Sequence, residues 1–409
     1  MRSWNAPGLP SLPGHGEPPR VFDTPSGVLT AFEGNGTASL YVCGITPYDA
    51  THLGHASTYL AYDTLNRVLR DAGFDVNYVQ NVTDVDDPLL ERAAKIGVDW
   101  RELAESQIEL FRGDMRALRI IPPEHYVGVV ESIDEIAAAV ATLLDNGLAY
   151  WVESPDAAPD LYFDIAAAEE VSPWQLGQES RLNRATMLVL SAERGGDPDR
   201  EGKRDPLDPL LWSAARPGEP SWDSVVGTGR PGWHIECSVI GLHHLSSPIS
   251  LNGGGSDLIF PHHEFSAAHS AALNGTTWSR VYSHTGMVAY QGEKMSKSLG
   301  NLVLVSRLVA DGVDPRAIRL AVLAEHYRSD WEWTDAHLTT AVERLGRWRS
   351  WASTAVGDDT RVLERLRAVL GEDLDTPGAL ALIDAEVAAR ARPSEVIVDA
   401  LDALLGIRL

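Results

Sequence analysis

The chain has 409 residues, of which 44% are apolar and 22% are charged, and its formal net charge at pH 7 is −24. This length allows roughly two or three domains with sizeable cores, and this charge disfavours nucleic acid as a partner unless a local basic groove overrides it. Because the sequence has no apolar run that could span a bilayer, no signal-peptide core at its start and no cysteines besides Cys43 and Cys237, we expect a cytoplasmic, globular protein without a disulfide framework or a membrane partner.

The first part of the chain is predicted to form a βαβ unit after an irregular arm. Such an arm is more often a flexible tail, although Trp4 could hold it against the surface. SLYVCGIT predicts a buried strand over 39–46, HASTYLAYDTLNRVLRDAGF predicts a helix over 55–74 with Gly73 as its C-terminal cap, and DVNYVQNVTD predicts a strand over 75–84. We therefore expect a parallel sheet that binds ligands at the carboxyl ends of its strands.

The middle of the chain interrupts this pattern. Residues 99–147 read as polar helices, and a more irregular segment follows to about residue 229. GWHIECSVIGLHH then predicts a helix and PISLNGGGSDLIF a further buried strand, so the sheet is expected to be split by an insertion. From Asp335 onwards helical patterns with Arg and Ala predict a helical C-terminal domain.

The motif THLGHA stands in the predicted turn between the first strand and its helix. There, His52 and His55 would meet a phosphate together with the free backbone N–H groups and the positive end of the helix dipole. Gly54 between them would allow a ligand to approach the backbone. Two surface histidines near a helix start are common, so the motif alone is weak evidence for a phosphate site.

The motif GEKMSKSLGN carries Lys294 and Lys297 on a predicted flexible loop. Lysine acts on a polyphosphate as a mobile point charge. A solvated surface loop is the ordinary interpretation of two lysines at this spacing, but the full string KMSKS is much rarer. Together with the upstream HLGH it is specific.

This pair of motifs resembles that of the class I aminoacyl-tRNA synthetases. The strings YVCGITPYDATHLGHASTYLAYD, NVTDVDD, GRPGWHIECS, GGGSDLIFPHHE and HTGMVAYQGEKMSKSLGN are similar to cysteinyl-tRNA synthetases, over roughly residues 21–390. The resemblance implies an α/β protein with a Rossmann-type catalytic domain. We expect an arm at 1–35, the two halves of the catalytic domain at 36–125 and 206–275 around a connective insertion at 126–205, a stem-contact region with the lysine loop at 276–334, and a helical domain at 335–409.

The resemblance also implies one zinc ion, held in that family by two cysteines, a histidine and a glutamate. The matching positions are Cys43, Cys237, His262 and, one helical turn further, Ser266. A neutral hydroxyl is a poor zinc ligand, and Glu264 should point elsewhere. Three protein ligands with an open fourth position are typical of a substrate-binding zinc, which would select the cysteine thiolate over serine. Without the resemblance, two lone cysteines are more often buried small hydrophobes.

By resemblance, His52, His55, Lys294 and Lys297 would stabilise the phosphates of ATP while the cysteine carboxylate attacks the α-phosphate. Mg²⁺ is expected with ATP, although no motif identifies its ligands. We assign His263, Glu264 and the acidic run at 84–87 no catalytic role, because such residues more often cap helices. The residues expected to line the cysteine and adenylate sites are Cys43, Gly44, Ile45, Thr46, Thr58, Asn81, Thr83, Trp233, Gly255, Ser256, Asp257 and Val288.

Three departures from the tRNA enzymes concern the acceptor. The chain ends near the helices that should precede an anticodon domain, and residues 335–409 hold thirteen acidic and nine basic side chains. The other departures are Ser266 and the insertion motif ERGGDP at 193–198. All three resemble the paralogous cysteine ligases of mycothiol biosynthesis, which join cysteine to the amine of glucosaminyl-inositol with release of AMP and diphosphate.

We therefore expect ATP, L-cysteine and glucosaminyl-inositol as partners, no tRNA, and a monomer. One alternative is a short cysteinyl-tRNA synthetase, which a basic face or an anticodon domain would favour. Another is a non-catalytic relative that senses cysteine or nucleotide, which degraded HLGH or KMSKS motifs would favour, and both motifs are intact.

Overall fold

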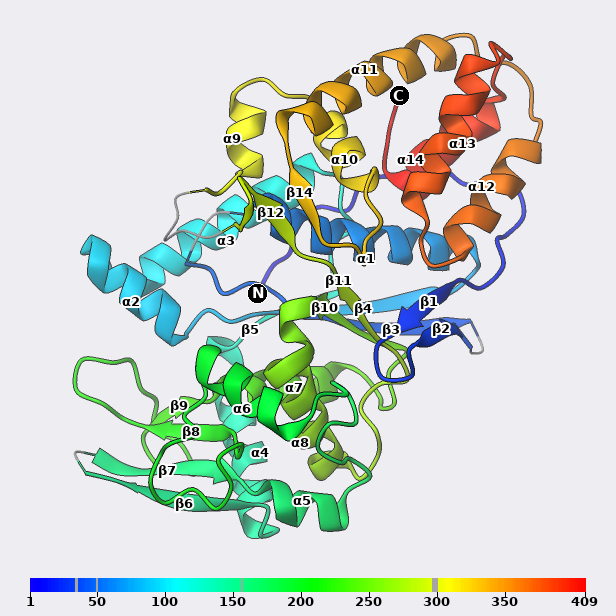
Figure 1. Ribbon diagram of the computed structural model, residues 1–409. Coiled ribbons are helices and arrows are strands. Elements are labelled where there is room, and N and C mark those ends of the chain that lie inside the picture. Colours follow the sequence, from blue (N-terminus) through cyan, green and yellow to red (C-terminus); the bar gives the residue numbers. More distant parts are fainter. Residues whose placement is uncertain (34–35, 49–50, 156, 296–300) are drawn as a thin grey trace.

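A computed structural model describes residues 1–33, 36–48, 51–155, 157–295 and 301–409 (Figure 1). Its central sheet has the strand order β11-β10-β3-β4-β5, and every neighbouring pair is parallel. This arrangement confirms the predicted α/β fold with a parallel sheet. The strands of this sheet are β3 (Thr37–Val42), β4 (Asp75–Val82), β5 (His125–Gly128), β10 (Leu251–Gly255) and β11 (Tyr282–Thr285).

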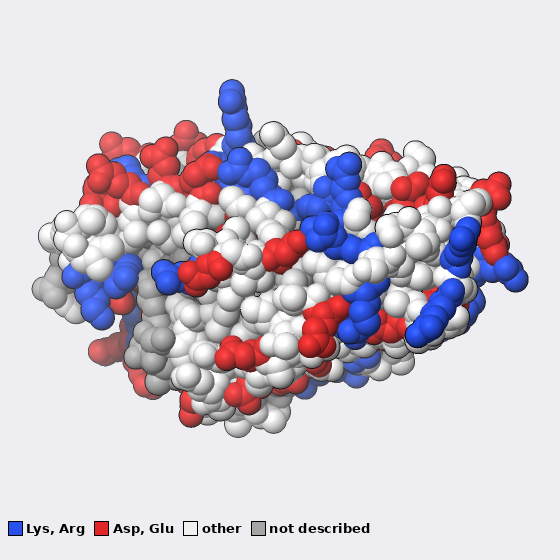
Figure 2. Space-filling view, turned by 90° about the horizontal axis from the view of Figure 1, so that it is seen from above, with Lys and Arg blue, Asp and Glu red and all other residues white. Residues whose placement is uncertain are grey.

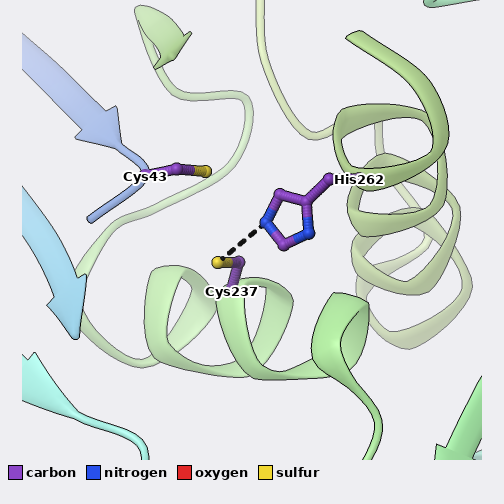
Figure 3. A group of neighbouring side chains, drawn as sticks. All are labelled: Cys43, Cys237 and His262. Carbon is purple, nitrogen blue, oxygen red and sulfur yellow. Dashed lines mark hydrogen bonds between the residues drawn. The ribbon is translucent and has the colours of Figure 1, made fainter. Parts of the chain in front are cut away.

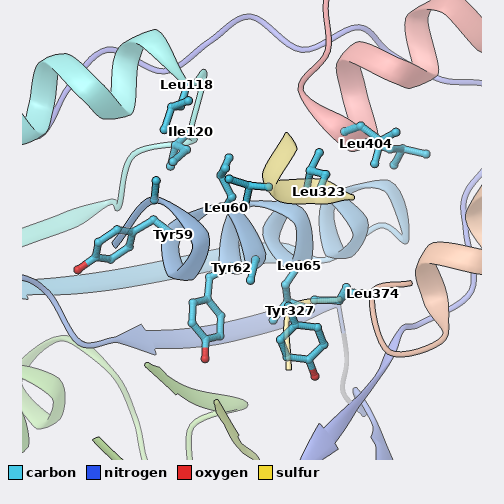
Figure 4. Close-up of a cluster of buried hydrophobic side chains, with 14 of the residues drawn as sticks. Tyr59, Leu60, Tyr62, Leu65, Leu118, Ile120, Leu323, Tyr327, Leu374 and Leu404 are labelled. Atoms are coloured by element: carbon cyan, nitrogen blue, oxygen red, sulfur yellow. The ribbon is translucent and has the colours of Figure 1, made fainter. Parts of the chain in front are cut away.

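Helix α1 (Leu53–Asp71) connects β3 to β4 and forms the centre of the molecule. The predicted helix is confirmed, and Gly73 follows it with a φ of 88°, a backbone conformation that favours glycine. Most of α1 is buried between the sheet and the later helices α10 (Pro315–Leu323) and α14 (Glu395–Leu405). Figure 4 shows Leu60 of α1 in the same buried cluster as Leu323 of α10 and Leu404 of α14. The catalytic unit and the C-terminal helices therefore share one core.

The insertion contains an antiparallel sheet with the order β6-β7-β8-β9, where an irregular segment was expected. Pro159 and Asp160, residue types that strands disfavour, break the apolar alternation of β7. Asp160 is nevertheless buried, because Ala214 N donates to it at 2.8 Å and Arg216 pairs with it at 2.8 Å. This sheet extends to Pro231, beyond the expected boundary at 205. Its strands are β6 (Ala149–Ser154), β7 (Ala157–Phe163), β8 (Leu210–Ala214) and β9 (Gly229–Pro231).

Two shorter β-structures were also not predicted from the sequence. The segment expected to be helical contains β5, a four-residue edge strand of the central sheet. The N-terminal arm contains a hairpin of β1 (Arg20–Asp23) and β2 (Val28–Ala31). The arm is not a flexible tail at its start, where Trp4 is buried and its Nε1 donates to Ile120 O at 2.8 Å.

The remaining elements complete the insertion, the stem-contact region and the C-terminal helices. In the part of the chain that the structure describes, no helix combines the length and apolar character needed to cross a membrane. These elements are α2 (Asp87–Ile96), α3 (Trp100–Ala117), η1 (Val130–Ser132), α4 (Ile133–Asp145), α5 (Ile165–Val171), α6 (Arg184–Glu193), α7 (Trp233–His244), η2 (Ser256–Leu258), η3 (Ile259–His263), α8 (Glu264–Asn274), β12 (Val288–Tyr290), β13 (Glu293–Lys294), α9 (Val305–Ala310), β14 (Trp331–Trp333), α11 (Asp335–Ala352), α12 (Arg361–Gly371) and α13 (Thr376–Ala388).

Candidate active site

A cavity of about 880 Å³ opens at the carboxyl ends of the central strands. Its volume is in the range of small-molecule sites, and its position is where parallel sheets bind ligands. It brings together most of the residues expected from the sequence. The expected residues that line it are Cys43, Gly44, Ile45, Thr46, His52, His55, Thr58, Trp233, Gly255, Asp257 and Val288.

The two histidines of THLGHA lie at the start of α1. His52 is the N-cap residue, and its Nδ1 accepts a hydrogen bond from Gly54 N at 3.1 Å. The His52 and His55 rings stack with their centroids 3.9 Å apart. A Cβ on Gly54 would lie 2.8 Å from the His52 ring, so this glycine makes room for the histidine rather than for a ligand. The stacked pair gives the cavity two imidazoles beside the free N–H groups of a helix start.

The lysine motif is described only in part. Lys294 lies in β13, which pairs with β12, and Met295 lines the cavity. This pairing places Lys294 opposite Ala289, the residue after Val288, which also lines the cavity. Lys297 lies outside the described residues.

Cys43, Cys237 and His262 converge from three separate elements (Figure 3). Cys43 follows β3, Cys237 lies on α7, and His262 lies in η3 just before α8. All three are buried, and their ligand atoms lie within 4.8 Å of one another, with His262 Nε2 3.1 Å from Cys237 Sγ. The spacing read from the sequence therefore does bring the three residues together.

The chemistry of these donors fits zinc. Burial and the neighbouring histidines hold the pKa of His262 well below its usual range, which keeps the imidazole neutral as a metal ligand must be. The hydrogen bond with the Cys237 sulfur, followed by burial, raises the pKa of the Cys43 thiol. A bound cation favours the thiolate and would reverse that shift. Two thiols and a neutral imidazole converging on one point are a typical zinc donor set.

Ser266 and Glu264 are both engaged elsewhere. Ser266 Oγ donates to His234 O at 3.2 Å. Glu264 accepts hydrogen bonds from Trp174 Nε1 at 3.1 Å and from the backbone N of Ser180 at 2.8 Å, so its carboxylate serves the insertion. The expectation that Glu264 points away from the metal ligands is confirmed.

Trp233 lines the cavity and packs against one of the three metal-ligand candidates. Its ring stacks on that of His262 with the centroids 4.2 Å apart. The ring packs against a candidate metal ligand and also lines the cavity, so it limits the size of any side chain that could reach the two sulfurs.

Asn81, Thr83 and Ser256 lie outside the cavity lining. Asn81 Oδ1 accepts from Gly44 N at 2.8 Å, and its Nδ2 donates to Thr83 Oγ1 at 3.2 Å. A Cβ on Gly44 would lie 1.6 Å from Asn81 O, so only glycine allows this close approach. Asn81 and Thr83 are therefore placed to position the loop that carries Gly44 and Thr46. Ser256 opens η2, next to the cavity residues Gly255 and Asp257.

Several cavity residues were missed or undervalued in the sequence. Asp86, in the acidic run, caps α2 as expected by accepting from Asp87 N at 2.9 Å, but it also lines the cavity. Burial raises its pKa to about 6. Tyr48, Arg230 and the turn at 193–197 line the cavity as well. The only sequence signal for that turn was the unassigned motif ERGGDP.

Comparisons with known proteins identify relatives of this chain over its full length. A family model described as tRNA synthetases class I (C) catalytic domain matches residues 30–343. A relative from Clavibacter michiganensis, named L-cysteine:1D-myo-inositol 2-amino-2-deoxy-alpha-D-glucopyranoside ligase, is 62% identical over 421 residues that cover 100% of this chain and 99% of the relative. A relative of the same name from Nocardia farcinica is 56% identical over 418 residues that cover 100% of both chains.

Among solved structures, the methionyl-tRNA synthetase of Mycobacterium tuberculosis bound by methionyl-adenylate is similar, with a TM-score of 0.60. The match covers 90% of this chain and 88% of that chain at 16% identity, so it bears on the fold alone.

Proposed function

Because the chain belongs to the class I tRNA synthetase family and, within it, to the L-cysteine:1D-myo-inositol 2-amino-2-deoxy-alpha-D-glucopyranoside ligases, we propose that it joins L-cysteine to the amine of that amino sugar in mycothiol biosynthesis. ATP is converted to AMP and diphosphate. The observation that carries this proposal is one cavity that contains the stacked pair His52 and His55 and adjoins the convergent Cys43, Cys237 and His262.

In the first step, an oxygen of the cysteine carboxylate attacks the α-phosphorus of ATP. The new P–O bond gives cysteinyl-adenylate, and the bond to diphosphate breaks. His52 and His55, with Lys294 and Lys297, are proposed to stabilise the negative charge that develops on the phosphates. Asp257 faces the cavity beside Gly255, where a carboxylate can accept hydrogen bonds from the ribose hydroxyls.

In the second step, the amine nitrogen of the acceptor attacks the carbonyl carbon of the adenylate. The amine first gives up its ammonium proton to solvent, and its nitrogen then forms the C–N bond of the amide. The C–O bond to the phosphate breaks, AMP leaves, and the nitrogen releases its second proton to solvent. The enzyme's contribution is to hold the two reactants together, and this can supply a large part of the rate acceleration.

We propose that Cys43, Cys237 and His262 hold a zinc ion that, when bound, would keep the substrate sulfur as a thiolate. Thr46 and Thr83 are proposed to lie near the cysteine ammonium, with Thr46 accepting from it and Thr83 acting through the loop. Trp233 restricts the pocket, because its ring packs on His262. Serine would enter such a pocket with only a protonated hydroxyl, and this supports selection of cysteine.

The charge of the protein supports a small acceptor. Residues 335–409 hold thirteen acidic and nine basic side chains. On the face shown in Figure 2, which includes the C-terminal helices, Lys and Arg lie interspersed with Asp and Glu. A tRNA surface requires a continuous basic track along the backbone. We also propose that the enzyme acts as a monomer.

The test is amide formation by the purified enzyme with ATP, Mg²⁺ and cysteine, with glucosaminyl-inositol and a tRNA pool as parallel acceptors. We expect the amide and a matching amount of AMP with the amino sugar, and no charged tRNA. Charging of tRNA, or adenylate formation with neither acceptor used, would overturn the proposed acceptor.

A further inference from the structure

The cavity has a second wall, which comes from the insertion and from the start of α2 rather than from the carboxyl ends of the central strands. This wall includes Asp86 and Glu91 from the α2 region and a turn at residues 193–197, which follows α6. The first step of the proposed reaction uses none of these residues. In Figure 1, α2 and the insertion strands β8 and β9 lie on the same side of the molecule.

The 193–197 turn is fixed to the catalytic unit by Arg194. Its guanidinium Nη1 donates to Asp257 O at 2.6 Å and also to Phe260 O. These carbonyls belong to the segment that carries Asp257 and leads to His262. Arg194 therefore sets the distance between the turn and the residues proposed to bind ribose and zinc.

The other end of the turn is fixed from within the insertion. The Lys203 side chain is 3% exposed, and its Nζ donates to Asp197 Oδ1 at 2.9 Å and to Pro206 O at 2.8 Å. Tyr162 donates its hydroxyl to Asp197 as well. A Cβ on Gly196 would lie 2.2 Å from Ser191 Oγ, so this close approach requires glycine. The turn is therefore a rigid part of the cavity wall.

Several carboxylates in this wall can accept further hydrogen bonds. In the described part of the chain, Glu193 and Glu91 are exposed to the cavity and make no hydrogen bond or ion pair. Asp86 receives one bond from a backbone N–H within its own helix cap. Asp87, in contrast, is already paired with Arg230 at 2.5 Å. Carboxylates accept hydrogen bonds from hydroxyls and, more strongly, from ammonium groups.

We propose that this wall is the acceptor site, where Glu193 and Glu91 accept hydrogen bonds from the hydroxyls and the cationic amine of the amino sugar. The assignment rests on the proposed function. A hydroxyl-rich amine complements the two carboxylates that have no partner in the described chain. The rigid link through Arg194 then fixes the distance between the acceptor and the activated cysteine.

The test compares Glu193→Gln and Glu91→Gln with the control Glu201→Gln, which makes the same change at an exposed position of the same insertion outside the cavity. Two rates are measured for each variant. The first is the rate of amide formation as a function of glucosaminyl-inositol concentration, and the second is the rate of cysteine-dependent exchange of diphosphate into ATP, a reaction that does not involve the acceptor. We expect each cavity variant to raise the acceptor KM roughly tenfold, since each loses the negative charge that strengthens a hydrogen bond from the acceptor. The exchange rate serves as the internal reference and should stay within about twofold of the wild type, and the control should match the wild type in both.

The outcomes separate the two proposals. An unchanged acceptor KM in both cavity variants, with a wild-type enzyme that makes the amide, overturns the acceptor site and leaves the function intact. An equal loss in exchange and in amide formation also overturns it, because the wall would then act on the adenylate. A wild-type enzyme that exchanges diphosphate but makes no amide overturns the proposed function and the acceptor site with it.

Discussion

Two clusters of buried polar groups lie at opposite ends of α1, and they differ in how completely the chain satisfies them. Towards the C-terminal end, the Asp63 carboxylate accepts from Arg67 Nε at 2.7 Å and from Ile121 N at 2.8 Å, and it pairs with Arg319. The three charged side chains are at most 1% exposed. The arginines also donate to backbone carbonyls, for example Arg319 to Leu118 O at 2.8 Å and Arg67 to Asp402 O at 2.9 Å.

Beyond the N-terminal end of α1, the ligand atoms of Cys43, Cys237 and His262 lie within 4.8 Å of one another, and their side-chain partners are one another and neighbouring histidines, with Cys43 Sγ 3.3 Å from His263 Nε2. His262 Nε2 meets Cys237 Sγ at 3.1 Å, and its Nδ1 meets Nδ1 of His234 at 3.1 Å. Their sulfur and nitrogen lone pairs converge where a cation would complete the set.

The two clusters therefore have different roles, one structural and one chemical. The Asp63 cluster is a closed set, in which every charge has a partner from the chain, so its role is to join α1 to the C-terminal helices. The cysteine–histidine cluster is suited to an added cation and a substrate, so its role is chemical. Substitutions in the first should change stability more than turnover, and substitutions in the second should do the reverse.

The largest effect is expected for Cys237→Ser. Losing one of three proposed zinc ligands should lower kcat/KM for cysteine by roughly 10⁴-fold, the scale on which a site rejects a partner that lacks a required polar group. Zinc content per chain and cysteine-dependent diphosphate exchange measure the two consequences separately. Full zinc content together with unchanged exchange would contradict the ligand assignment, and an unchanged melting temperature would show that the variant folds.

Asp63→Asn should act on stability instead. Removing one partner of a buried ion pair leaves buried charge uncompensated, and this costs about 3–5 kcal/mol of the free energy of unfolding. Urea unfolding measures the loss, while turnover per folded molecule should change little. The control is Asp311→Asn, whose exposed partner Arg307 is 75% exposed, so that pair is worth less than about 1 kcal/mol. Equal losses in the two variants would contradict the closed-set interpretation.

The functional cluster was largely predictable from the sequence, and the structural one was not. The βαβ unit follows from local periodicity, and the residues of the site lie in motifs whose spacing matches that of the resembling family. Asp63 and Arg319, in contrast, are 256 positions apart, and no local pattern indicates that they meet. The insertion sheet was missed for a related reason, because the Asp160 carboxylate in β7 is paired with Arg200 and Arg216, 40 and 56 positions later. The motif ERGGDP marks the turn at 193–197 in the sequence, but it does not indicate what the turn contacts. Arg194 donates to backbone carbonyls, which every residue carries.

An intermediate effect is expected for Gly54→Ala, which perturbs the functional end of α1. The new Cβ would lie 2.8 Å from the His52 ring, so the stacked histidines must shift. A displacement of about 1 Å in a catalytic group can reduce turnover about 100-fold. The matched control is Gly113→Ala in α3, where a Cβ meets nothing within 4 Å, and which should stabilise the helix by roughly 0.5–1 kcal/mol. A kcat for Gly54→Ala equal to that of the control would contradict the placement of His52.

The smallest effect is expected for Ser266→Ala, and it tests whether the Ser266 hydroxyl is a zinc ligand. Ser266 stands at the position where the resembling tRNA enzymes have a fourth zinc ligand, but its hydroxyl donates to His234 O at 3.2 Å. Removing one such hydrogen bond costs about 1 kcal/mol of stability. Zinc content and kcat/KM for cysteine should stay at the wild-type level, because three protein ligands leave the fourth position to the substrate. A loss of zinc as large as that of Cys237→Ser would instead place the hydroxyl among the ligands and leave the substrate thiolate no vacant position.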